Sequence, residues 1–131
     1  MEAVIPILPT LKARSEFLAV RGGRRSSTPA FLIEMRERPD VITRAVEGPR
    51  FGFTITKKIG NAVTRNRIRR RLKAAFAADL KQRTLGACDY VVVARRAALD
   101  RPYALLLGDV TQAMSALQHG RPARANKKGS A

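Results

Sequence analysis

The stretch TKKIGNAVTRNRIRRRLKAAF, residues 56–76, decides what this chain can fold into and bind. It carries eight basic side chains and no acidic one. These are Lys57, Lys58, Arg65, Arg67, Arg69, Arg70, Arg71 and Lys73. Charge at this density cannot pack into a core, because an unpaired buried charge is too costly. The stretch must therefore face water or a polyanion, and arginine is the better residue for a planar, bidentate grip on phosphate.

The whole chain has the same bias. Its 131 residues include 26 Lys and Arg against 10 Asp and Glu, which gives a formal net charge of +16. This excess attracts phosphate backbones, but it also suits an anionic membrane surface. A helix face that is only solvated usually mixes both signs of charge, whereas residues 56–76 carry one sign, so we prefer a polyanion as the ligand.

The residues on both sides of the two lysines predict a strand, a turn and a helix. Residues 50–56 alternate, with Phe51, Phe53 and Ile55 on one face, which is the period of a half-buried strand. The other face (Gly52, Thr54 and Thr56) is small enough for a ligand to approach the backbone closely. Gly60-Asn61 predicts a turn, and a helix is expected over residues 62–80. Its apolar positions recur at helical spacing and are Ile68, Leu72, Ala75 and Phe76.

The flanking sequence adds further elements. Residues 16–21 predict a short helix with Ser15 as its N-cap and Gly22-Gly23 as its end. Residues 22–30 are interpreted as a polar loop with Arg24 and Arg25 available for phosphate, and residues 31–36 as a strand. Residues 37–49 are interpreted as a loop with room for an extra strand, and residues 83–87 as a turn. Residues 89–95 form a continuous β-branched run, which is typical of a buried strand.

A last helix is predicted after Asp100, which would cap it, with Pro102 in its first turn. Its expected core-facing stripe is Tyr103, Leu107, Val110, Met114 and Leu117. The fold class is therefore α+β: a small α/β sandwich with one central sheet and helices packed on it. We expect a flexible segment at 1–9, one domain at 10–118 and a basic disordered tail at 119–131.

The sequence offers no constellation for protein-based chemistry. No His, Cys, Asp or Glu grouping has metal-ligand spacing, and there is no Ser/His/Asp set or Walker-type loop. We therefore predict no catalytic or metal-binding residue in the protein itself. Cys88 is expected to pack as a small apolar residue, and His119 to be exposed beyond the last helix. No apolar run approaches the roughly 20 residues that span a bilayer, so we expect a cytoplasmic protein without membrane association.

The segment FGFTITKKIGNAVTRNRIRRRLKAAF, residues 51–76, resembles the signature of the bacterial ribonuclease P protein subunit. That signature is a strand ending in Lys-Lys, a Gly-Asn-Ala-Val turn, and Arg-Asn-Arg opening a basic helix. The resemblance covers about residues 10–118. It implies a mixed sheet with an uncommon left-handed βαβ crossover, like the second domain of a small-subunit ribosomal protein. Right-handed crossovers prevail in about 98% of cases, so periodicity alone predicts nothing of the kind.

The resemblance also implies a function. Members of the family bind a large catalytic RNA, and the complex cuts the 5′ leader from precursor tRNA. The RNA holds the Mg²⁺ ions and performs the hydrolysis, while the protein grips the leader. We therefore expect an endoribonuclease subunit, a monomer in a 1:1 ribonucleoprotein.

Site residues follow from the family by matching positions. The residues expected to contact the catalytic RNA are Lys57, Lys58, Asn61, Arg65, Asn66, Arg67, Arg69, Arg70 and Lys73. Those expected in the leader cleft are Lys12, Arg14, Phe17, Thr54 and Thr56. The chain departs from the family at Glu34, where a tyrosine is usual, and at Arg21, where many members have an aromatic residue. A carboxylate at position 34 would repel leader phosphate unless it binds a cation or pairs with a nearby arginine.

Plainer interpretations stay open beside these. Phe17 can be a core residue of an amphipathic helix, Asn61 a turn or cap residue, and Asn66 a surface amide. Arg95 and Arg96 are better explained as the end of a strand than as RNA ligands. Two other functions compete: a structural RNA-binding protein of the ribosomal type, and a self-sufficient nuclease. The second is least favoured, because the acidic residues are scattered and the basic stretch contains none.

Overall fold

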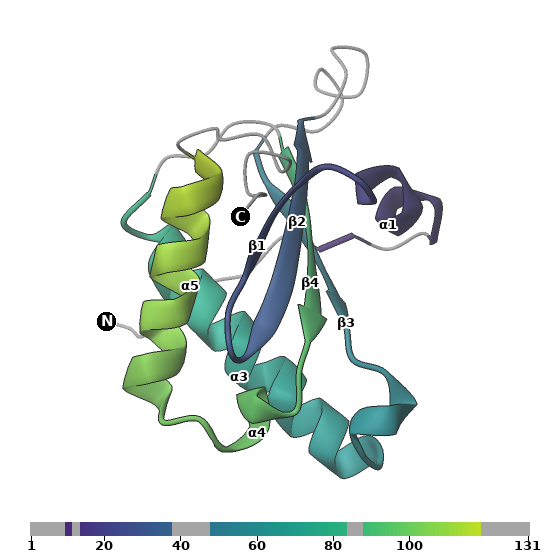
Figure 1. The fold of residues 1–131 in the computed structure, drawn as a ribbon, viewed down its shortest axis with the longest axis vertical. Coiled ribbons are helices and arrows are strands. Elements are labelled where there is room, and N and C mark those ends of the chain that lie inside the picture. Colours follow the sequence, from purple (N-terminus) through teal and green to yellow (C-terminus); the bar gives the residue numbers. More distant parts are fainter. Residues whose placement is uncertain (1–9, 12–13, 38–47, 84–87, 119–131) are drawn as a thin grey trace, which may run out of the picture.

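A single mixed sheet organises the chain (Figure 1). The computed structural model describes residues 10–11, 14–37, 48–83 and 88–118. The strands are β1 (Arg24–Ser27), β2 (Phe31–Glu37), β3 (Arg50–Thr54) and β4 (Cys88–Ala94), in the order β1-β2-β4-β3. β2 pairs antiparallel with both β1 and β4, whereas β3 runs parallel to β4. The expected α+β fold with one mixed sheet is confirmed.

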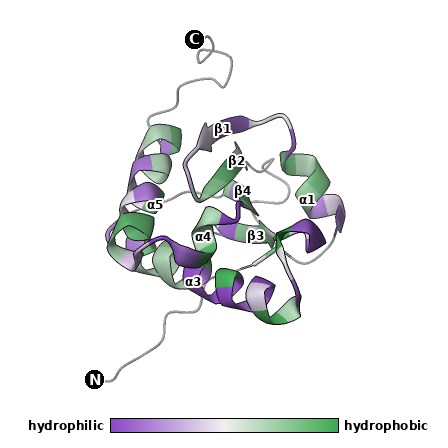
Figure 2. Cartoon of the chain, turned by 60° about the horizontal axis from the view of Figure 1, so that its bottom comes forward, coloured by the Kyte–Doolittle hydropathy of each residue, from purple (hydrophilic) through white to green (hydrophobic). Residues whose placement is uncertain are grey.

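Two long helices cover one face of this sheet, and a short helix lies on the other (Figures 1 and 2). The helices are α1 (Arg14–Val20), the 3-10 turn η1 (Lys57–Ile59), α3 (Ala62–Leu80), α4 (Ala97–Asp100) and α5 (Tyr103–Gln118). α3 and α5 pack on the covered face, and α3 connects the parallel strands β3 and β4. The bounds of α3 match the predicted helix at 62–80.

The alternation of side chains along each strand divides the interior in two. Phe31, Phe51 and Phe53 point to the covered face, where all three rings contact Phe76 of α3 at centroid distances of 5.4–5.8 Å. A smaller cluster lies on the opposite face, under α1. Its members are Leu11, Val20 and Val91, with Phe17 and Val93 at its margin.

The interpretation of residues 22–30 as a polar loop is wrong for residues 24–27, which form β1. β1 is an edge strand that pairs with β2 alone. An edge strand with polar side chains lacks the apolar alternation by which strands are recognised in a sequence. A turn that connects β1 to β2 is fixed by Thr28, whose Oγ1 accepts from the backbone N–H groups of Ala30 and Phe31.

Three further expectations at helix ends need correction. Asp100 does not cap the last helix but ends the separate helix α4, because Arg101 precedes Pro102 and is extended, with ψ 130°. Tyr103, predicted to begin the core-facing stripe of the last helix, is 44% exposed. Leu106 is buried in its place. Ser15 lies inside α1 and is not its N-cap, whereas the glycine end is confirmed by Gly22 with φ +84°.

Several expectations fall on residues outside the described part of the chain. These are the flexible segment 1–9, Lys12, the extra strand within 38–47, the turn at 84–87, and the tail 119–131 with His119. Among the described helices, none is long and apolar enough to cross a membrane.

Candidate nucleic-acid interface

The turn between β3 and α3 fixes where the basic helix begins. Asn61 is the N-cap of α3: its side-chain Oδ1 accepts a hydrogen bond from the backbone N–H of Thr64 at 2.9 Å. This satisfies one of the donors that a helix start leaves without an internal partner. The interpretation of Asn61 as a cap residue is confirmed, and its side chain remains exposed at the surface.

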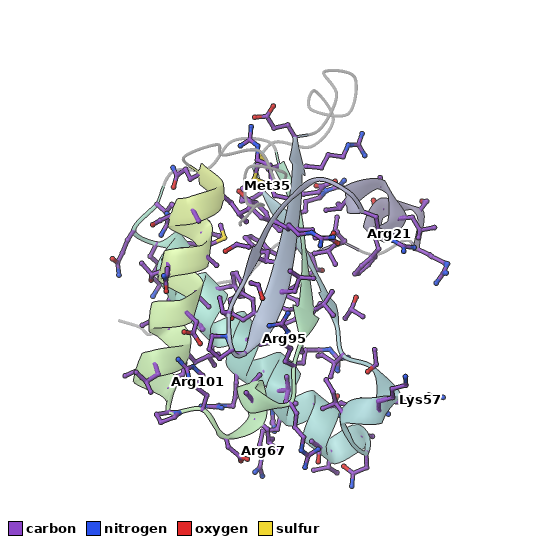
Figure 3. All side chains as sticks on the ribbon, in the orientation of Figure 1. Arg21, Met35, Lys57, Arg67, Arg95 and Arg101 are labelled. Atoms are coloured by element: carbon purple, nitrogen blue, oxygen red, sulfur yellow. The ribbon has the colours of Figure 1, made fainter. Side chains whose placement is uncertain are left out.

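A positively charged surface extends from η1 along α3. We call it the basic surface and define it by the residues predicted to contact catalytic RNA on η1 and α3: Lys57, Lys58, Asn61, Arg65, Asn66, Arg67, Arg69, Arg70 and Lys73. Within it, Lys57, Lys58, Arg67 and Arg70 are exposed. Figure 3 shows Lys57 and Arg67 pointing away from the body of the fold at the end where α3 begins. The positive end of the helix dipole adds to the attraction for anions.

Two hydrogen bonds orient the half-buried arginines of this surface. Arg65 donates from Nε to the carbonyl of Gly60 at 3.1 Å, which ties the first turn of α3 to the preceding loop. Arg69 donates from Nη1 to Oδ1 of Asn66 at 2.8 Å. Asn66 is thus a surface amide, and it orients Arg69 from one helical turn away.

A cavity of about 160 Å³ lies where the outer edge of β3 meets α1 and α3. Its lining brings together Thr10, Leu11, Phe17, Phe51, Gly52, Phe53, Arg69 and Lys73. One of the residues predicted for the leader cleft, Phe17, therefore shares a cavity with two predicted for the catalytic RNA. Arg69 also lines a second cavity of about 380 Å³ with Val63, Asn66 and Arg70.

The other residues predicted for the cleft are not gathered there. Arg14 is exposed at the start of α1, Thr54 is half-buried on β3, and Thr56 is exposed just before η1. None of these three lines the cavity beside Phe17. The expectation that the small face of β3 leaves its backbone open is wrong at Gly52, which is buried beneath the Phe17 ring.

A charged network that sequence reasoning missed anchors α1 to the sheet. Arg50 of β3 donates to both carboxylate oxygens of Asp89 at 2.9 and 2.8 Å, and to Glu16 of α1 at 3.0 Å. The hydrogen bond to Asp89, with the negative charges of Asp89 and Glu16, raises the pKa of Arg50 above its usual value despite partial burial. The only signal in the sequence is an arginine at the start of a strand.

Glu34 is the departure from the family that bears on the leader cleft. Its side chain is 12% exposed, on the same side of β2 as α1, and its carboxylate lies 3.5 Å from Nη2 of Arg25. Arg25 comes from β1, directly opposite Glu34 in the sheet. The arginine partner that would relieve the repulsion of a leader phosphate is therefore present.

Other arginines belong to the framework. Arg71, although part of the basic stretch, donates to the carbonyl oxygens of Ala98 and Leu99 at 2.5 and 2.9 Å, and to that of Arg101. Arg95 donates to the carbonyl of Thr28 at 2.7 Å and Arg96 to that of Ile59. β4 ends at Ala94, so the interpretation of Arg95 and Arg96 as the end of a strand is confirmed.

Cys88 is half-buried against the core, as expected for a small apolar residue. In the part of the chain that the structure describes, no three His, Cys, Asp or Glu side chains form a group that could hold a metal ion.

Comparison with known proteins identifies the family to which the chain belongs. The family model described as Ribonuclease P matches residues 8–118. The chain belongs to the ribonuclease P protein family. It is 45% identical over 109 residues to the ribonuclease P protein component of Brucella suis, which covers 81% of this chain and 77% of the relative. It is 40% identical over 105 residues to that of Bartonella quintana, covering 78% and 77%.

Solved structures agree with this family at the level of the fold. The RNase P protein of Staphylococcus aureus superposes with a TM-score of 0.67 at 22% identity, over 83% of this chain and 94% of the other. The RNase P protein of Thermotoga maritima gives 0.65 at 20% identity, over 86% and 97%. Membership of this family makes the chain the protein part of an endoribonuclease complex whose partner is the ribonuclease P RNA.

Proposed function

We propose that this chain binds the catalytic RNA of ribonuclease P and the 5′ leader of precursor tRNA, and so assists removal of the leader. In this proposal the RNA carries the hydrolysis with its Mg²⁺ ions. The protein acts as a monomer in a 1:1 ribonucleoprotein and supplies binding and orientation.

The observation that carries the proposal is the continuity between the basic surface and the cavity beside Phe17. Arg69 belongs to both, since it lines the cavity with Phe17 and Lys73 and a second cavity with Asn66 and Arg70. One RNA can therefore lie along α3 while a second, single strand reaches the aromatic ring. A ring that shares a cavity with two cationic side chains suits an unpaired nucleotide, because the base can stack while the phosphate is neutralised.

The acidic side chains support a binding role. Five of them are held in ion pairs with arginine: Glu16, Glu34, Asp79, Asp89 and Asp109. These carboxylates are already engaged within the fold. The exposed positive charge of the basic surface is left to a phosphate backbone.

The test is cleavage of precursor tRNA at about millimolar Mg²⁺ by the cognate catalytic RNA, with and without the protein. We expect strong stimulation, with one cut at the junction between leader and mature tRNA, and little or no cleavage by the protein alone. Cleavage that is unchanged by the protein would contradict the proposal. If such a protein instead co-sedimented with ribosomal subunits in high salt, the ribosomal type of RNA-binding protein would replace it.

A further inference from the structure

On the face of the sheet that carries α1, β3 contacts two consecutive residues of that helix, Glu16 and Phe17. Arg50 and Gly52 are two positions apart on the strand, so they point to the same face of the sheet. Arg50 bonds to Glu16, and Gly52 lies under Phe17. Strand and helix are thus joined at two adjacent points, and one of the two holds the ring that lines the cavity.

Gly52 provides a seat that no other residue type can provide. A Cβ atom at this position would lie 2.3 Å from Cε2 and 2.6 Å from Cζ of Phe17, and 3.0 Å from Cδ1 of Leu11. The two distances to Phe17 are far below van der Waals contact, so any side chain at position 52 must displace the ring, whereas Leu11 would need to move by only a few tenths of an ångström. The glycine is needed here for close approach, not for an unusual backbone angle.

Arg50 fixes the helix from the neighbouring position. Its side chain is only 14% exposed and is held by both oxygens of Asp89, the residue directly opposite it on β4. From this rigid base its Nη1 reaches Glu16 at 3.0 Å. A bidentate pair with a carboxylate that is 5% exposed gives the guanidinium a defined direction.

We propose that Gly52 and Arg50 are positioning residues for single-stranded RNA: they set the place and the tilt of the Phe17 ring beside Arg69 and Lys73. This inference rests on the proposed function. Neither residue needs to touch RNA. Gly52 acts by leaving the space that the Phe17 ring occupies. Arg50 acts by holding α1, through Glu16, at the distance from the sheet that places the ring in this space.

Gly52→Ala is the decisive variant. The measured quantity is the ratio of affinities of the protein–RNA complex for precursor and mature tRNA, because only the precursor has a leader. We expect this ratio to fall at least about fivefold, the loss of one stacked base. The affinity of the protein for the catalytic RNA should stay unchanged. Gly108→Ala on α5 is the matched control, since a Cβ there meets nothing within 4 Å, and it should leave both quantities as they are.

A double-variant cycle separates positioning from a general loss of structure. If Gly52 acts through the ring, Phe17→Ala and the pair Phe17→Ala with Gly52→Ala should have the same reduced preference for precursor tRNA. The pair should also unfold at a higher temperature than Gly52→Ala alone, because the clash is gone. Independent, additive effects on the preference would overturn the role of Gly52.

Glu16→Ala tests the second contact while leaving Arg50 on Asp89. We expect a smaller fall in the same ratio, and an unchanged ratio would remove Arg50 from the proposal. A wild-type complex with no preference for precursor over mature tRNA would overturn the proposed leader binding and this role with it. The unfolding temperatures of the cycle would still report whether ring and glycine are coupled.

Discussion

Arg70 and Arg71 are neighbours in the sequence, and the difference between them separates two regions of the molecule. Arg70 is exposed on the basic surface, whereas Arg71 donates to three carbonyl oxygens at the end of α4 and just beyond it. The same residue type thus serves two purposes on α3. On one side of the helix arginine is an RNA ligand in our proposal, and on the other it holds the framework together. Positive charge on this chain does not measure its capacity to bind RNA.

The largest effect that tests this comparison is expected from Arg71→Ala. The change removes the side-chain donor from the carbonyls of Ala98, Leu99 and Arg101, which should lower the free energy of unfolding by about 2–4 kcal/mol. Urea unfolding followed by circular dichroism measures it. A loss below about 0.5 kcal/mol, the usual effect of a surface substitution, would place Arg71 with Arg70 and abolish the distinction.

Arg70→Ala should show the opposite behaviour. We expect unfolding to change by less than about 0.5 kcal/mol, because the side chain is exposed. Binding to the catalytic RNA should weaken, and the slope of log K against log salt should shrink by about 0.9 if one duplex phosphate contact is lost. Filter binding over a range of salt concentrations gives both quantities.

Lys81→Ala provides the control for Arg70→Ala. Lys81 is exposed and is the C-cap residue of α3, so its removal deletes one positive charge at the opposite end of the helix from Asn61. If both variants weaken RNA binding equally, net charge governs the affinity, and the basic surface has no special place.

The smallest effect is expected at Glu34. Glu34→Gln removes a negative charge from the side of the sheet that carries α1 and releases Arg25 from its ion pair. Both changes favour a leader phosphate, so the affinity for precursor tRNA should rise. The rise should stay within about fivefold, because the interaction between two charges near the protein surface is worth about 1 kcal/mol when water screens it. Affinity for mature tRNA should not change. A fall in the affinity for precursor tRNA would show that the carboxylate itself contacts the leader.

The sequence predicted those parts of the fold whose signals are local. The bounds of α3 follow from its own periodicity and from Asn61, which caps it three residues before its partner Thr64. β1 was missed, because a polar edge strand is defined by its pairing with β2 and not by its own residues. The division of the last helix was missed too, although Pro102 carried the signal.

The candidate site was predictable in composition but not in arrangement. Arg71 could have been distinguished from Arg70, since it lies three residues after Ile68 and four before Ala75, along the margin of the buried stripe. Its partners on α4 and just beyond it, at a sequence separation of 27 to 30 residues, could not be predicted. The contact of Phe17 with Gly52 likewise depends on how α1 lies on the sheet.

The strand order has a consequence for the growing chain. Of the strands that the structure describes, β4 is the last to be synthesised, yet it lies between β2 and β3, which do not pair with each other. Until residues 88–94 emerge, the β1–β2 hairpin and β3 have no common partner, and isolated hairpins are at best marginally stable. The basic helix is therefore complete before the sheet that covers its apolar side. A nascent chain that stops short of β4 would expose that apolar side together with its positive charge, a combination prone to aggregate with cellular RNA.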